Sequence, residues 1–347
     1  MSVHDDRQKT GRGGTSAPRG VTMAAVGRLA GVSQVTVSRA LSDPSKVSPE
    51  TLRRIREAIE VTGYVPNAVA GALASRRSKL ITALVPSITN IVYSSMIQTF
   101  TGELRAQDYQ ILMSETGFDP KVEEAAVATH LSRRPDAVLL TGIHHSPQTR
   151  RMLLAAEIPV VELWDITDTP IDLCVGFSHV ESGRAVARFC REAGYLRAAT
   201  VSAGDERAIR RKDAFVREFG RPGGEAVQEV TYAGSASLVR GREALVRLLD
   251  EAGFRNGVVV CSSDLLAHGV VIEAAARGLE VPGEIAVVGF GDQDYAAHIV
   301  PSLTTVRVDR EALGRVAAQA ILARIEGGEP PPAVTDLGFE IIRRESA

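Results

Sequence analysis

A short stretch near the N-terminus carries side chains that suit the reading of DNA bases. Gln34, Val35, Ser38 and Arg39 fall on one side of a predicted helix. Glutamine can bond two groups on an adenine edge, arginine can bond two acceptors on a guanine edge, and valine can contact a thymine methyl group. The plainer alternative is that these are solvated residues of an ordinary helical cluster. An exposed valine beside these polar side chains favours base recognition.

Hydroxyl side chains at or near predicted helix starts suit contacts with phosphate. Backbone N–H groups at a helix N-terminus attract anions, and such contacts position a protein on DNA without reading its sequence. The residues expected to make these contacts are Thr22, Ser33, Thr36 and Ser48.

Three short helices would have to hold these side chains. Thr22 and Ser33 can cap the first two helices, and Gly31 can adopt the left-handed conformation of the sharp turn between them. Ser48 followed by Pro49 is a strong start signal for the third helix. The residues of the second helix expected to face the core are Val37, Ala40 and Leu41. This pattern predicts a helix-turn-helix domain over residues 21–65, and a generic three-helix cluster is the alternative.

The motifs in this segment are long and specific. Residues 21–23 (VTM), 30–41 (AGVSQVTVSRAL), 47–51 (VSPET) and 63–67 (GYVPN) together closely resemble the LacI/GalR family of repressors. The resemblance extends over roughly residues 21–345. It implies a sequence-specific transcriptional regulator that binds a palindromic operator as a homodimer, with one head on each half-site.

Residues 66–79 are expected to form a hinge helix or linker. Eight or so residues with a central glycine, Gly71, cannot hold a helix alone in water. The resemblance implies that two such segments fold against each other on DNA and that Leu73 wedges into the minor groove. It also places Asn67, at the end of the head motif, among the DNA-binding residues. A plain linker is the alternative.

The rest of the chain alternates apolar runs with amphipathic stretches, which indicates parallel sheets covered on both faces. Two such sets fit an α/β body of two doubly wound lobes, and by resemblance this body is similar to periplasmic sugar-binding proteins. We therefore expect a disordered tail over residues 1–20 and an effector-binding and dimerisation domain over residues 80–347. The first lobe is expected to take residues 80–176 and 305–333, and the second residues 177–304 and 334–347.

Ligands of open α/β sheets bind outside the carboxyl ends of the strands. The side chains expected to bind an effector there are Tyr93, Trp164, Arg207, Arg211, Asp264 and Gln293. Asp264 could accept from paired hydroxyls, Arg211 could hold a carboxylate or hydroxyls, and an aromatic ring could supply a flat wall. The resemblance matches Tyr93, Arg211 and Asp264 to effector contacts.

Each of these residues also has a structural alternative. Asp264 could simply cap a helix beginning at Leu265, Trp164 could be plain core, and the arginines with Lys212 could be a solvated helix face. Residues 158–163, 175–177, 205–207 and 336–339 look like the gluconate-repressor branch of the family. This resemblance implies a sugar acid such as gluconate as the effector.

Charge is divided unevenly along the chain. Residues 1–79 hold 13 lysines and arginines against 6 aspartates and glutamates, a net charge of +7, whereas residues 80–347 hold 27 against 36, a net of −9. A basic head on an acidic body is expected when one end meets polyphosphate, although a basic tail without consequence is an alternative. No apolar run could span a membrane, no signal peptide is evident, and three separated cysteines suggest buried thiols, so we expect a cytoplasmic protein.

The competing classes are an enzyme or a solute-binding protein built on the same body. The sequence contains no P-loop and no nucleophile elbow, and His144-His145 lacks a third metal ligand, so we expect no catalysis, no metal and no cofactor. A ligand that closes the cleft between the two lobes would change the spacing between the hinge segments of the two subunits. Whether the ligand releases DNA or tightens the grip, as a corepressor would, stays open; a nutrient-like sugar acid favours release.

Overall fold

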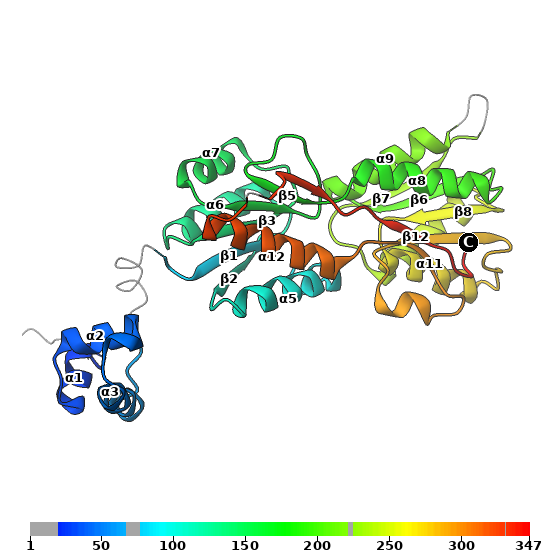
Figure 1. Cartoon of the computed structure of the whole chain (residues 1–347). Coiled ribbons are helices and arrows are strands. Elements are labelled where there is room, and N and C mark those ends of the chain that lie inside the picture. The colour runs from blue at the N-terminus through cyan, green and yellow to red at the C-terminus, as the bar shows by residue number, and fades with distance from the viewer. Residues whose placement is uncertain (1–19, 67–76, 221–224, 330) are drawn as a thin grey trace, which may run out of the picture. The chain divides into compact units, whose positions relative to one another are not determined.

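The computed structural model describes residues 20–66, 77–220, 225–329 and 331–347, which belong to two compact units divided in the sequence between Ser78 and Lys79. The smaller unit is the head and the larger is the body (Figure 1). The expected tail and the expected DNA contacts Asn67 and Leu73 lie outside the described residues.

The described part of the head consists of three helices, as predicted. They are α1 (Met23–Ala30), α2 (Gln34–Ser42) and α3 (Pro49–Thr62), with a short 3-10 turn (Pro44–Lys46) before α3. The hydroxyls of Thr22, Ser33 and Ser48 accept hydrogen bonds from backbone amides of the first turns. Gly31 ends α1 with φ 66°, the left-handed conformation that the turn needs.

The core of the head is small and joins all three helices. Val26, Val37, Ile55 and Tyr64 are among its buried residues. Leu41 was expected to face this core, but it is 37% exposed. Leu41 is the next-to-last residue of α2, and helical spacing alone gave the wrong side for it.

The first lobe of the body contains a parallel sheet in the order β11-β5-β4-β3-β1-β2. Its strands are β1 (Leu80–Val85), β2 (Gln110–Glu115), β3 (Ala137–Thr141), β4 (Val160–Leu163), β5 (Leu173–Gly176) and β11 (Val334–Asp336). The helices are α5 (Ile91–Arg105), α6 (Pro120–Leu131), α7 (Pro147–Ala156) and α12 (Arg310–Glu326). α5 packs on α12 and α6 on α7, so the two pairs cover opposite faces of the sheet.

The second lobe repeats this plan with the order β12-β10-β9-β8-β6-β7. Its strands are β6 (Ala198–Ala203), β7 (Gln228–Tyr232), β8 (Gly257–Cys261), β9 (Ile285–Phe290), β10 (Thr304–Arg307) and β12 (Glu340–Ile342), of which β12 runs antiparallel to β10. α8 (His179–Glu192) packs on α9 (Glu206–Phe219), and α10 (Leu238–Val246) packs on α11 (Asp264–Ala276). A single turn of π-helix (Arg247–Glu251) extends α10, and a 3-10 turn (Asp294–Ala297) follows β9.

The crossings between the lobes differ from the expected boundaries. The expected boundary between the lobes fell inside residues 304–307, with residue 304 in the second lobe and residue 305 in the first. In the structure these residues form β10, which pairs with β9 and belongs wholly to the second sheet. Residues 334–336 were assigned to the second lobe, but β11 pairs with β5 in the first sheet, and the chain crosses back only after them, as the red segment in Figure 1 shows. Such short strands look alike in sequence, and only their hydrogen-bonding partners decide which sheet they join.

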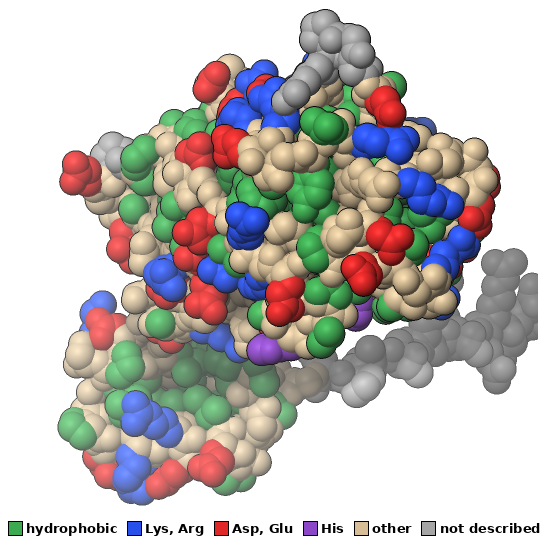
Figure 2. Space-filling model, turned by 90° about the vertical axis from the view of Figure 1, so that its right-hand side faces the viewer, with side chains coloured by type: hydrophobic (Ala, Val, Ile, Leu, Met, Phe, Trp, Pro, Cys, Tyr) green, Lys and Arg blue, Asp and Glu red, His purple; other side chains and the backbone are tan. Residues whose placement is uncertain are grey.

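The face of the body in Figure 2 carries basic and acidic side chains interspersed with small apolar areas. The net negative charge of the body is therefore not gathered into one field on this face. Among the described residues, no helix is both long enough and apolar enough to cross a bilayer.

Candidate functional site

The exposed side of α2 carries the predicted base-reading residues. Gln34, Val35, Ser38 and Arg39 are all exposed there, and Val35 is 67% exposed. The opposite side of α2 buries Val37 and Ala40 in the core of the head. A valine left open to water next to an arginine and a glutamine is the arrangement expected of a helix that enters the major groove.

The residues predicted to touch phosphate lie at helix starts, but their hydroxyls are used differently. The Ser33 and Thr36 hydroxyls are 2.9 Å apart and bonded to each other, and Ser48 donates to the Thr51 hydroxyl. The Thr22 hydroxyl accepts from the amide of Ala25, which leaves its proton available to a phosphate oxygen.

The residues expected to bind an effector lie where the two lobes meet, and an aromatic cluster forms the first-lobe side. Tyr93, from the first turn of α5, and Trp164, just after β4, have ring centres 5.8 Å apart. Trp164 also meets Phe177 edge to face, with ring centres 5.3 Å apart. Trp164 is only 3% exposed, so it serves largely as core that backs the Tyr93 ring.

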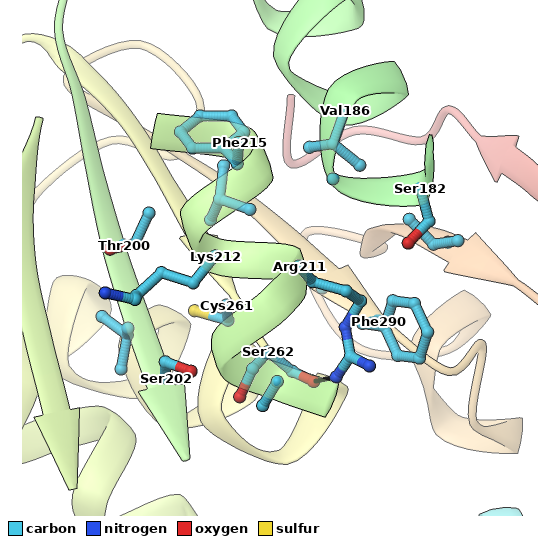
Figure 3. Close-up of a pocket in the computed structure, with 16 residues that line it drawn as sticks. Ser182, Val186, Thr200, Ser202, Arg211, Lys212, Phe215, Cys261, Ser262 and Phe290 are labelled. Atoms are coloured by element: carbon cyan, nitrogen blue, oxygen red, sulfur yellow. Dashed lines mark hydrogen bonds between the residues drawn. The ribbon is translucent and has the colours of Figure 1, made fainter. Parts of the chain in front are cut away.

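Arg211 on α9 is held in place by a chain of hydrogen bonds. Its Nη1 donates to Nδ1 of His179 over 2.9 Å, and Nε2 of His179 donates to the Trp164 carbonyl over 3.0 Å. Burial, together with the neighbouring arginines, holds the pKa of His179 well below its usual value, so the ring is neutral and can accept from Arg211. Nη2 of Arg211 donates to the Ser262 carbonyl, and the guanidinium carbon lies 3.9 Å from the Phe290 ring centre (Figure 3).

Asp165 belongs to this site although the sequence reasoning missed it. It follows Trp164 directly, is 1% exposed, and forms an ion pair with Arg210 of α9. Gly176 makes room for it, since a Cβ there would lie 2.0 Å from the Asp165 carbonyl oxygen. Burial raises the pKa of Asp165, against the opposing charge of Arg210. The rule that ligands bind at strand carboxyl ends applied to Asp165 as well as to Trp164 and could have found it.

Asp264 is engaged entirely by protein groups. It is fully buried, Oδ1 accepts from the Thr305 hydroxyl over 2.5 Å, and Oδ2 accepts from the amide of Gln293 over 2.7 Å. Gly289 leaves space for the carboxylate, because a Cβ there would lie 2.2 Å from Oδ1. The expectation that Asp264 accepts from ligand hydroxyls does not fit this geometry, and neither does the helix-cap alternative, because Ser263 caps α11.

A cavity of about 30 Å³ lies behind Arg211, between α8, α9 and the second sheet (Figure 3). Ser182, Thr200, Phe215 and Cys261 are among its lining residues. This volume holds about one water molecule, so the cavity itself cannot take a sugar.

The adjacent histidines take separate partners. Nε2 of His144 lies 3.1 Å from Glu206, and the buried His145 lies between Glu123 and Glu162. In the described part of the chain, no group of three or more histidine, cysteine or carboxylate side chains is placed to hold a metal ion.

Comparison with known proteins agrees with this architecture. The family model described as bacterial regulatory proteins, lacI family, matches residues 22–67, and a periplasmic binding protein-like domain matches residues 185–347. The HTH-type transcriptional regulator GntR of Pseudomonas aeruginosa is 36% identical over 94% of this chain and 95% of its own length. The protein of the same name from Escherichia coli K12 is 33% identical over 90% of this chain and 94% of its own.

Solved structures are similar over the same regions. A Lacl family transcriptional regulator from Silicibacter pomeroyi superposes with a TM-score of 0.89 at 32% identity, covering 94% of this chain and 99% of its own. A complex of the regulator CelR with cellobiose has a TM-score of 0.66 at 26% identity, covering 94% and 100%. The chain belongs to the lacI family of bacterial regulatory proteins. It is a DNA-binding transcriptional regulator and not an enzyme.

Proposed function

We propose that this regulator is a cytoplasmic homodimeric repressor that leaves a palindromic operator when a small sugar or sugar acid binds between its lobes. The observation that carries the proposal is the site where α9 meets the first lobe. There, Arg207 of the second lobe faces the rings of Tyr93 and Phe118 of the first lobe, and the same chain carries an exposed helix suited to reading bases.

A polyhydroxylated ligand fits the chemistry of this site. Guanidinium groups donate several hydrogen bonds in a fixed fork, and the ring of a tyrosine can lie against the apolar face of a sugar chain. The resemblance to the gluconate-repressor branch and the similarity to the GntR proteins favour gluconate or a related acid. The sugar bound to CelR supports a ligand of this general kind. Tyr93, Arg207 and Arg211 are the residues proposed to contact it, with Trp164 and Gln293 supporting from behind.

Binding between the lobes would couple to DNA through the relative position of the lobes. A ligand that favours one arrangement by about 1–3 kcal/mol changes operator affinity by roughly 5- to 150-fold. Both lobes also leave apolar side chains exposed that a second copy could cover, among them Ile91 and Met113 in the first lobe and Val239 in the second.

The DNA-binding half of the proposal can be tested by selection from a randomised duplex library with the full-length protein. We expect enrichment of an inverted repeat whose half-sites match by two-fold symmetry. Enrichment of a single asymmetric site, or of none, would contradict the dimeric, palindromic mode of binding.

A further inference from the structure

The charged side chains at the start of α9 are paired unequally. Asp165 and Glu206 hold Arg210, and Nε of Arg210 lies 2.6 Å from Glu206. The His179 ring and the Ser262 carbonyl hold Arg211. Arg207, one turn before them, forms no ion pair with any carboxylate of the described residues, and its Nη1 has no hydrogen-bond partner there.

Arg207 is nevertheless almost completely enclosed. It is 6% exposed, and its guanidinium reaches from the second lobe to three residues of the first. The guanidinium carbon lies 5.7 Å from the Tyr93 ring centre and 5.6 Å from the Phe118 ring centre. Gly142 has φ 98°, and a Cβ there would lie 3.4 Å from Nη1, so the absence of a side chain leaves space beside that nitrogen.

An enclosed guanidinium without a counter-ion is unfavourable. Arginine does not lose its proton inside a protein, and burial of an unpaired charge is strongly opposed by the loss of hydration. The neighbouring aromatic rings offset part of this cost through cation–π attraction, and the Tyr93 hydroxyl also interacts with the guanidinium, but Nη1 is left without a partner. An anion from solution would give Nη1 the acceptor that it lacks and would compensate the charge.

We infer that Arg207 holds the carboxylate of the effector and makes the site selective for a sugar acid over the neutral sugar. A carboxylate is planar and presents two oxygens, which matches the fork of a guanidinium. Arg210 is paired with carboxylates and both Nη atoms of Arg211 donate to protein groups, whereas Nη1 of Arg207 has no partner, so Nη1 of Arg207 is the donor offered to a ligand carboxylate. This inference rests on the proposed function. It adds that the ligand is negatively charged and that Arg207 binds the charged group.

The test compares a sugar acid with its neutral amide. Isothermal titration calorimetry of the full-length protein with D-gluconate, D-gluconamide and D-glucose measures whether the carboxylate charge matters. We expect the unaltered protein to bind gluconate at least ten-fold more tightly than gluconamide. In Arg207→Gln this preference should disappear, chiefly through loss of gluconate affinity. Arg217→Gln is the matched control, because Arg217 lies exposed on the same helix.

A second measurement separates a ligand-binding role from a structural one. Because Arg207 is unpaired without ligand, the ligand-free Arg207→Gln protein should melt at the same temperature as the unaltered protein or higher. A clear fall in the melting temperature would mean that Arg207 stabilises the fold, and it would overturn the inference. So would an unaltered preference for gluconate in Arg207→Gln.

The outcomes also separate this inference from the proposed function. If the unaltered protein binds glucose and gluconamide as well as gluconate, the sugar-type effector stands and the carboxylate role of Arg207 falls. If it binds none of these compounds and no other aldonate or aldose, both fall together.

Discussion

At the scale of single residues, one exposed arginine should decide which operator the head prefers. Arg39 lies on the exposed side of α2 and has no carboxylate neighbour that neutralises it among the described residues, whereas Glu50 and Glu57 hold Arg53 on α3. A guanidinium that is free to approach a guanine edge helps the protein to discriminate between base pairs, while one held in ion pairs contributes less.

Arg39→Ala should therefore weaken binding to the selected operator by about 1–3 kcal/mol, or roughly 5- to 150-fold. Binding to random duplex should change far less. Fluorescence anisotropy with both DNAs at one stated salt concentration measures the ratio, and Arg53→Ala is the control. An equal loss on both DNAs would reduce Arg39 to a phosphate contact.

Asp264 shows why a strand-end position does not by itself identify a ligand contact. Its two oxygens connect the start of α11 with β10 and with the turn after β9. Asp264→Ala would leave the Gln293 amide and the Thr305 hydroxyl without partners in a buried place. We expect a loss of about 2–4 kcal/mol in the free energy of unfolding. Urea unfolding measures this loss, and an unchanged stability with a lost ligand response would restore the ligand-binding interpretation.

At the scale of elements, a buried histidine fixes the loop after β3 against α6 and β4. Nδ1 of His145 lies 2.8 Å from Glu123, and Nε2 lies 3.1 Å from the Gly142 carbonyl and 3.5 Å from Glu162. Burial alone would lower the pKa of His145, but the hydrogen bonds and charges of Glu123 and Glu162 outweigh it and raise the pKa to about 9. The same loop carries Gly142, the residue that leaves space beside Arg207.

The sign of the pH effect follows from this shift. The pKa of His145 is higher in the folded protein than the ordinary value of about 6.5, so the charged ring stabilises the fold fully below that pH. This stabilisation, roughly 3 kcal/mol for a shift of that size, should be lost as the pH rises through about 9. Urea unfolding of the unaltered protein and of His145→Gln at pH 6, 7.5 and 9.5 measures it. The stability difference should shrink with rising pH, and a constant difference would contradict the assignment.

At the scale of the whole molecule, helix caps and turns could be predicted from the sequence, whereas the pairing of strands that are distant in sequence could not. The caps Thr22, Ser33 and Ser48 and the turn at Gly31 depend on residues within one helical turn, so the sequence contained all the necessary information. The strand at residues 304–307, β10, pairs with residues of β9 that lie more than 15 positions earlier in the sequence. The strand at residues 334–336, β11, pairs with residues of β5 that lie more than 150 positions earlier. The same is true of the contacts that engage Asp264 and Arg211 and leave Arg207 unpaired, because those contacts join separate strands, helices and lobes.

We propose above that a small polyhydroxylated ligand controls the affinity of this regulator for DNA. The measurement that tests it most directly is fluorescence anisotropy of the full-length protein on the operator obtained by selection, titrated with D-gluconate and related sugars at fixed salt. We expect tight binding without ligand and a roughly 5- to 150-fold loss of affinity with one of these compounds. Operator affinity that none of these compounds changes, or that rises when one is added, would contradict it.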